Sequence, residues 1–273
     1  MRAVTLAGQA LPPIGQGTWR MGEDPSRRQE EIAALRLGLE LGLKVIDTAE
    51  MYGEGEAERV VGEALRGNTE PLYLVSKVYP HNASRNGVIA ACERSLKRLG
   101  VERLDLYLLH WPGEYPLEET IEGFDQLREA GKIGAWGLSN FDLPDVQGTP
   151  LGNCATHQVL YNPEARGIEY DLLPWAAEQG TPIMAYCPLS QGGRFLVHPA
   201  LQQIAVRHKV TPPEVCLAWV IRSGNVMAIP KAVDPVHVRL NARAAGLQLT
   251  PQDLAELDAA FPPPTRKQRL RMV

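Results

Sequence analysis

The sequence predicts an α/β fold: one domain over residues 1–273, built as a (β/α)8 TIM barrel with an N-terminal β-hairpin. Short apolar runs alternate with amphipathic segments of helical period along the whole chain. The runs are apolar without alternation, which is typical of parallel strands buried on both faces. The length of 273 residues also fits a single barrel of roughly 250 residues.

The elements are expected in the following order. A hairpin at Val4–Leu6 and Ala10–Leu11 comes first. Eight strands follow at Ile14–Trp19, Lys44–Thr48, Leu72–Lys77, Leu104–His110, Ile133–Ser139, Ala155–Tyr161, Ile183–Pro188 and Val226–Lys231. Helices are expected at Gln29–Leu41, Glu56–Leu65, Ala83–Leu99, Leu117–Ala130, Leu172–Gln179, Pro199–His208 and Pro212–Arg222. Four glycines fall where helices should end and suit left-handed caps: Gly42, Gly100, Gly131 and Gly180.

Composition excludes several classes of function. With 44% hydrophobic and 22% charged residues the chain can bury a large core, and a net charge of −4 argues against electrostatic binding to nucleic acid or membranes. No apolar stretch is long enough to span a bilayer, and the four scattered cysteines favour reduced thiols in the cytoplasm. We expect a monomer, with the basic run Arg266–Arg271 as a solvated end.

Polar side chains end three consecutive predicted strands. Asp47 ends the second, with Tyr52 in the loop after it, Lys77 ends the third and His110 ends the fourth. In a closed barrel these strand ends meet at one rim, where barrels carry their chemistry. We therefore expect the four side chains to share one small site.

The chemistry of the four groups assigns roles. A phenol gives up its proton near pH 10, and a nearby cation lowers that pKa. Lys77 can supply the cation, Asp47 can keep Lys77 protonated and fixed, and His110 can orient a carbonyl oxygen beside Tyr52. The sequence thus predicts Tyr52 as a general acid for carbonyl reduction.

Neither a metal set nor a dinucleotide fingerprint is evident. The six histidines are scattered, without HxxxH or HxH, and there is no GxGxxG. A metal-dependent isomerase or hydrolase that uses Asp47, Glu50 and His110 as ligands stays open as an alternative.

Short motifs along nearly the whole chain resemble the aldo-keto reductases. They are GTW at Gly17–Trp19, DTAEMYG at Asp47–Gly53, SK at Ser76–Lys77, LLHWP at Leu108–Pro112, GLSNF at Gly137–Phe141, AYCPL at Ala185–Leu189 and IPK at Ile229–Lys231. The resemblance implies a (β/α)8 barrel that binds NADPH without a Rossmann domain. It also implies a catalytic tetrad of Asp47, Tyr52, Lys77 and His110.

The resemblance also implies a cofactor site. Ser139, Asn140 and Gln158 would hold the nicotinamide carboxamide, and Tyr186 would stack on its ring. The other implied contacts are Thr18, Trp19, Asp47, Leu189, Gln191, Lys231, His237 and Asn241, with Gly192 and Gly193 near the pyrophosphate. The chain departs from the family at Ala232, where a hydroxyl residue is usual, and at His237, where an arginine is usual. NADPH is therefore the expected cofactor, and NADH is left open.

The expected substrate pocket is walled by Trp19, Tyr79, His110 and Trp111. The connection after the fourth strand is short, so we expect an open site for small aldehydes and dicarbonyls. The chain resembles the bacterial branch that reduces methylglyoxal, and the 2,5-diketo-D-gluconate reductases are the related alternative. A reductase for sugars or diketo acids, and a nicotinamide-binding regulatory protein without turnover, remain open.

Overall fold

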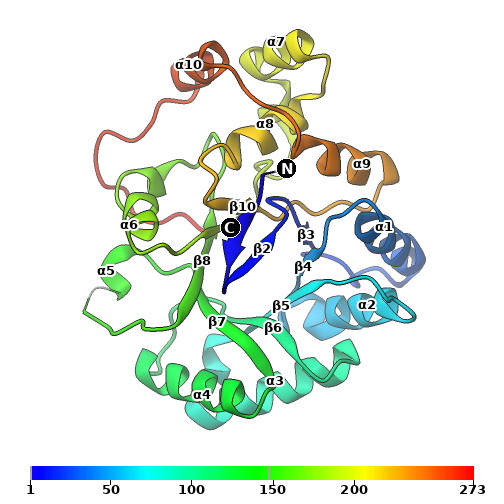
Figure 1. Cartoon of the computed structure of the whole chain (residues 1–273), viewed down its shortest axis with the longest axis vertical. Helices are drawn as coiled ribbons and strands as arrows, with labels where there is room; N and C mark the ends of the chain where they lie inside the picture. The colour runs from blue at the N-terminus through cyan, green and yellow to red at the C-terminus, as the bar shows by residue number, and fades with distance from the viewer. Residues whose placement is uncertain (1, 147) are drawn as a thin grey trace.

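The computed structural model describes residues 2–146 and 148–273. Eight parallel strands form one sheet in the order β10-β9-β8-β7-β6-β5-β4-β3, and helices cover its outside (Figure 1). The sheet closes on itself because Ile14 pairs in parallel with Ala228. Beyond that bridge, the Gly17 N–H donates to the Pro230 carbonyl at 3.0 Å. The predicted (β/α)8 barrel is confirmed.

The strands are short, and most lie within a residue or two of the predicted runs. They are β1 Val4–Leu6, β2 Gln9–Leu11, β3 Gln16–Gly17, β4 Val45–Asp47, β5 Tyr73–Val78, β6 Leu104–Leu109, β7 Ile133–Ser139, β8 Cys154–Leu160, β9 Ile183–Tyr186 and β10 Val226–Ala228. The first, seventh and eighth predicted barrel strands end earlier than expected, because the chain has already left the sheet at Trp19, Pro188 and Lys231.

The helices agree equally well. They are α1 Arg28–Glu40, α2 Glu56–Leu65, α3 Arg85–Leu99, α4 Leu117–Glu129, α5 Leu143–Val146, α6 Leu172–Glu178, α7 Pro199–His208, α8 Pro212–Val220, α9 Pro235–Ala244 and α10 Pro251–Ala260. The four predicted glycine caps have φ between 68° and 87°, so each adopts the left-handed conformation. Helices α5, α9 and α10 were not predicted.

The hairpin of β1 and β2 closes one end of the barrel. Val4, Leu6 and Leu11 are buried against side chains that fill the barrel interior, among them Tyr73 and Met227. These partners lie near the amino ends of their strands, so the hairpin seals that end. The opposite end, at the carboxyl ends of the strands, is the mouth.

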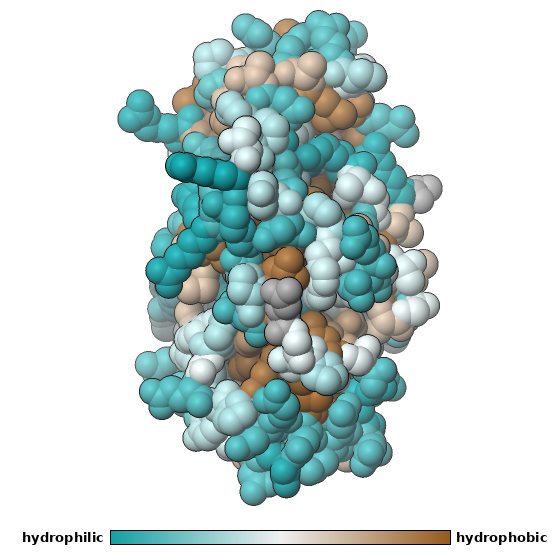
Figure 2. All heavy atoms as spheres, turned by 90° about the vertical axis from the view of Figure 1, so that its left-hand side faces the viewer, coloured by the Kyte–Doolittle hydropathy of each residue, from teal (hydrophilic) through white to brown (hydrophobic). Residues whose placement is uncertain are grey.

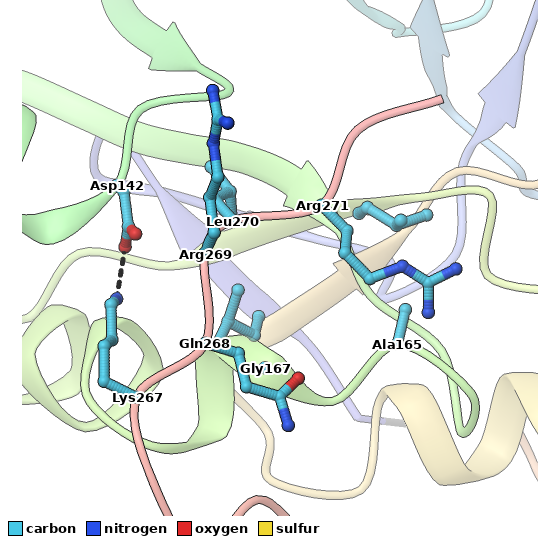
Figure 3. A pocket seen from close by; sticks show the side chains of 10 residues that line it. Asp142, Ala165, Gly167, Lys267, Gln268, Arg269, Leu270 and Arg271 are labelled. Atoms are coloured by element: carbon cyan, nitrogen blue, oxygen red, sulfur yellow. Dashed lines mark hydrogen bonds and ion pairs between the residues drawn. The ribbon is translucent and has the colours of Figure 1, made fainter.

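The C-terminal segment after α10 is solvent-exposed over most of Arg266–Arg271, as expected, but it is anchored to the barrel. It runs back across the barrel wall, where the Lys267 ammonium pairs with Asp142 at 2.6 Å (Figure 3). The same ammonium pairs with Asp171 at 2.7 Å. Leu270 packs against the core, and the Arg271 guanidinium donates to the Glu164 carbonyl at 3.2 Å. Long-range ion pairs thus fix a segment whose local sequence has no pattern.

The outer surface is mostly polar. On the face that carries α5 and α6, hydrophilic side chains predominate, and hydrophobic atoms are exposed between them in the middle and lower part (Figure 2). Within residues 2–146 and 148–273, no helix is long and apolar enough to cross a membrane. All four cysteines are free thiols. A cytoplasmic location and a monomeric state stay predictions.

Candidate active site

The four predicted catalytic residues lie together at the barrel mouth. Asp47 is the last residue of β4, Lys77 is the fifth of six residues in β5, and His110 follows β6 directly. The strands are parallel, with Asp47 opposite Val75 and Lys77 opposite Leu108, so each site residue lies two positions beyond the partner of the previous one and all leave the same face of the sheet. Tyr52 begins the turn between β4 and α2.

Lys77 is at the centre of the site. Its ammonium is fully buried and donates to Asp47 Oδ1 at 2.6 Å, to the Thr48 carbonyl at 2.8 Å and to the Tyr52 hydroxyl oxygen at 3.2 Å. Burial lowers the pKa of Lys77, while the charge of Asp47 and its hydrogen bond act in the opposite direction. The predicted partnership of Asp47 with Lys77 is confirmed.

The Tyr52 phenol is a protonated group. Its oxygen accepts the hydrogen bond from Lys77, so its own proton is free for another acceptor. Burial raises the pKa of Tyr52 well above 10.0, and the charge of Asp47 raises it further. Burial and, after it, the charge of Asp47 thus leave the pKa of Tyr52 raised, where a lowering by Lys77 was expected. The ammonium can still stabilise the phenolate through the same contact once the proton has left.

His110 faces Tyr52 across the mouth, with ring centroids 5.7 Å apart and planes at 75°. Burial lowers the pKa of His110 well below 6.5, and the charge of Lys77 lowers it further, so the imidazole is neutral at neutral pH. Its Nδ1 is buried and has no hydrogen-bond partner within the described residues. The ring is therefore positioned to bind a ligand atom rather than to carry charge.

Amide and hydroxyl groups extend the site along β7, β8 and β9. Gln158 lies opposite Ser139 in the sheet, and its amide donates to Asp47 Oδ2 at 2.8 Å. The Asn140 amide donates to the His110 carbonyl at 3.0 Å and accepts from the Tyr186 hydroxyl at 2.7 Å. Gln158 and Asn140, which are predicted to hold the nicotinamide carboxamide, are thus hydrogen-bonded to Asp47 and His110. Tyr186, the predicted stacking residue, is linked to them through Asn140.

Aromatic side chains form the rim of the mouth. Trp111 contacts the His110 ring at 4.8 Å and Tyr79 at 5.8 Å between ring centroids. Trp19 follows β3, and the Arg20 guanidinium carbon lies over its ring, 4.6 Å from the ring centroid.

The loop after β9 has a strained backbone. Cys187, Ser190 and Gln191 have φ of 46°, 49° and 60°, which is uncommon without glycine, and Gly192 and Gly193 continue the left-handed run. A Cβ on Gly193 would meet nothing within 4 Å, so the chain leaves open space there. Leu189 and Gln191, the two predicted contacts, both lie on this loop. Strain of this kind collects at binding loops.

The residues predicted for the adenosine end lie apart from the catalytic group. Lys231 follows β10 and is exposed, His237 is exposed on α9, and Asn241 is buried on the same helix. Burial lowers the pKa of Lys231, and the charges of Arg27 and Arg20 lower it further. Two arginines that the sequence did not suggest therefore stand near Lys231, beside the loop that follows β3.

The alternative metal site does not form. Both oxygens of Asp47 are held by Lys77 and Gln158, and Glu50 Oε1 accepts from the Tyr79 N–H at 2.8 Å. The part of the chain that the structure describes holds no group of three or more possible metal ligands. The donors of Asp47, Glu50 and His110 thus do not converge on one point.

Comparisons with known proteins agree with this geometry. The model of the Aldo/keto reductase family matches residues 13–261. The chain is 53% identical over 272 residues to the methylglyoxal reductase YeaE of Escherichia coli (strain K12). The match covers 97% of this chain and 96% of the relative. It is 30% identical to the methylglyoxal reductase DkgB of Escherichia coli O157:H7, over 91% of this chain and 94% of the relative.

Solved structures are similar over the full length. An aldo/keto reductase from Klebsiella pneumoniae, crystallised with NADP and acetate, has a TM-score of 0.97 and 49% sequence identity, covering 100% of this chain and 99% of that chain. The family model, the relatives and the solved structure each span most or all of this chain. The chain therefore belongs to the aldo/keto reductase family.

Proposed function

We propose that this aldo/keto reductase uses NADPH to reduce small aldehydes and dicarbonyls, methylglyoxal among them, with Tyr52 as the general acid. One observation carries the proposal: Lys77 donates to the Tyr52 oxygen at 3.2 Å, which leaves the phenolic proton for a carbonyl oxygen. Support for the substrate comes from the Escherichia coli relatives named methylglyoxal reductases. Support for the cofactor comes from the Klebsiella pneumoniae structure with NADP.

The residues at the mouth fit a nicotinamide cofactor. Ser139, Asn140 and Gln158 offer a hydroxyl and two amides to a carboxamide, and Tyr186 offers a ring face. The open backbone around Gly193 suits a pyrophosphate. Lys231, with Arg27 and Arg20 nearby, suits a 2′-phosphate and favours NADPH over NADH. When bound, NADPH supplies a hydride to the carbonyl carbon.

The chain's own residues move and stabilise the proton. Tyr52 donates its proton to the carbonyl oxygen, and Lys77 stabilises the phenolate that remains. Asp47 holds the ammonium in place, with its second oxygen fixed by Gln158. Neutral His110 donates a hydrogen bond that orients the carbonyl oxygen toward Tyr52.

The rim favours small substrates. Tyr79 and Trp111 form one wall of the opening, with their rings 5.8 Å apart between centroids. The connection between β6 and α4 is short, with α4 beginning at Leu117. Large sugars therefore find little surface to contact, whereas a two- or three-carbon dicarbonyl reaches the tetrad.

The proposal is tested by measuring NADPH oxidation with methylglyoxal, simple aldehydes, sugars and diketo acids, with and without EDTA. Tyr52→Phe should lower kcat by about 10²–10⁴-fold and leave NADPH binding, read by tryptophan fluorescence, nearly unchanged. Tyr170→Phe, on an exposed ring that hydrogen-bonds none of the site residues, is the control and should keep full activity. Substantial turnover in Tyr52→Phe would refute the acid role, and activity that EDTA removes would favour the metal-dependent alternative.

A further inference from the structure

A second buried charge network lies behind the Tyr52–Lys77 pair, and the proposed reaction does not use it. Ser76 precedes Lys77 in β5, so its side chain leaves the opposite face of the strand. There its hydroxyl donates to Glu58 Oε1 at 2.6 Å, and Arg98 Nε of α3 donates to Glu58 Oε2 at 2.5 Å. Ser76 and Glu58 are fully buried. Buried ion pairs add little net stability, so such a network suggests another role.

The Arg98 side chain also supports the turn that carries Tyr52. A Cβ on Gly55 would lie 2.6 Å from Arg98 Cδ and 2.7 Å from Arg98 Nε, so the guanidinium arm packs directly against this backbone. The turn is strained at Glu54, whose φ is 54°, and it stands between Gly53 and Gly55 with φ of 56° and 92°. Such a turn keeps its shape only where its surroundings hold it.

The third arm of the network reaches the end of β5. Arg98 Nη2 lies 3.9 Å from Glu50 Oε2. The Glu50 N–H donates to the Lys77 carbonyl at 3.3 Å, and Glu50 Oε1 accepts from the Tyr79 N–H at 2.8 Å. One guanidinium thus connects the loop after β4, the Tyr52 turn and the strand that holds Lys77.

We propose that Arg98 is a positioning residue for the reaction: through Glu50, Glu58 and the Gly55 backbone it sets the distance between the Tyr52 hydroxyl and the Lys77 ammonium. The proposal rests on the acid role of Tyr52 proposed above. Arg98 touches no reacting atom, and its effect is exerted on the geometry and field of the pair. A planar guanidinium suits this task because it serves several acceptors in fixed directions.

The network should also affect the protonation of Lys77. The charged and titratable groups that face Lys77 are Asp47 from β4, Tyr52 from the turn, His110 from the end of β6 and Glu58 from α2. The charge of Glu58 raises the pKa of Lys77. Removing that charge should bring the alkaline loss of activity to lower pH, whereas removing Arg98 should move it to higher pH.

The experiment compares Arg98→Met, Arg98→Lys and Glu58→Gln with Arg85→Met, a matched control on α3 whose half-exposed side chain pairs with Glu122. We expect Arg98→Met to lower kcat by about 10–100-fold, the scale of a displacement near 1 Å, with KM for NADPH unchanged. Arg98→Lys should recover part of this loss. The alkaline limb of the pH profile should shift in opposite directions in Arg98→Met and Glu58→Gln, while Arg85→Met matches the parent.

The proposal is overturned if Arg98→Met keeps the parental kcat and pH profile and only its Tm is lower. It is also overturned if the alkaline limb shifts in the same direction in Arg98→Met and Glu58→Gln. If Arg98→Met does not fold, Arg98→Lys with full kcat together with an unmoved limb in Glu58→Gln overturns it equally. Tyr52→Phe is measured in the same series. Activity retained there defeats the proposed function itself, whereas an inactive Tyr52→Phe beside a fully active Arg98→Met defeats only the positioning role.

Discussion

Lys77→Met should lower the free energy of unfolding of the barrel far more than the deletion of any surface charge does. The Lys77 and Asp47 side chains are 0% and 3% exposed, and their charged atoms lie 2.6 Å apart. Removing one partner leaves an uncompensated buried charge, which costs about 3–5 kcal/mol. Asp47→Asn should cost a similar amount, because the Lys77 ammonium would keep only neutral acceptors, the Thr48 carbonyl and the Tyr52 oxygen.

The double variant Lys77→Met/Asp47→Asn separates this effect from lost packing. Neither side chain is charged in it, so its free energy of unfolding should lie closer to the parent than either single variant does. A coupling of at least about 2 kcal/mol is expected. None of the three variants should reduce substrate, because each lacks the Lys77 ammonium or the Asp47 carboxylate that anchors it. The double variant should therefore recover stability without activity.

The assay is urea unfolding without cofactor, followed by tryptophan fluorescence. With a slope of about 3 kcal/mol per M, the urea midpoint of the single variants should fall by about 1–1.7 M. Lys132→Met is the control, because its pair with Glu93 is 38% and 50% exposed at 3.3 Å and should contribute about 0–1 kcal/mol. The reasoning fails if the two single costs simply add in the double variant.

Three further outcomes are expected. Because the pKa of His110 is well below 6.5, the ring stays neutral on mild acidification, and kcat/KM should show no loss near pH 6.5; a limb there would contradict the assignment. Burial raises the pKa of Asp253, but hydrogen bonds from Thr250 and His208 outweigh it and leave a value of about 2, against 3.8 unperturbed. That carboxylate therefore contributes about 2 kcal/mol of stability above pH 4 that is lost as pH falls toward 2, a slope that urea unfolding should no longer show in Asp253→Asn. Arg27→Gln should raise KM for NADPH more than for NADH. His237→Arg should lower KM for NADPH more than for NADH; equal effects on both cofactors would count against the 2′-phosphate assignment.

The four catalytic residues could be predicted because the ends of the strands can be recognised in the sequence. Asp47, Lys77 and His110 each close an apolar run, and the barrel brings such ends together. The direction of the Tyr52 pKa could not be predicted, because it depends on how deeply the hydroxyl is buried and on how closely Asp47 opposes Lys77. Chemistry at one residue followed from sequence, but the balance of opposing fields did not.

Helices α9 and α10 carried a signal that was overlooked. Each begins with an N-cap residue followed by proline, Asp234-Pro235 and Thr250-Pro251, which marks a helix start as well as a turn. The network around Arg98 carried no such signal, because Arg98 stands between Lys97 and Leu99 as an ordinary helical charge. Its partners are at distant positions in the sequence, and only the folded chain brings them together.

The hairpin that seals the amino ends of the strands has a kinetic consequence. With that end closed by Val4, Leu6 and Leu11, both reactants enter and both products leave by the same opening. Ser139 and Gln158 are each 1% exposed and lie deeper than the rim residues Tyr79 and Trp111. If a dinucleotide binds Ser139 and Gln158 as we propose, it must arrive before the carbonyl compound and depart after the alcohol, so excess substrate should delay cofactor exchange.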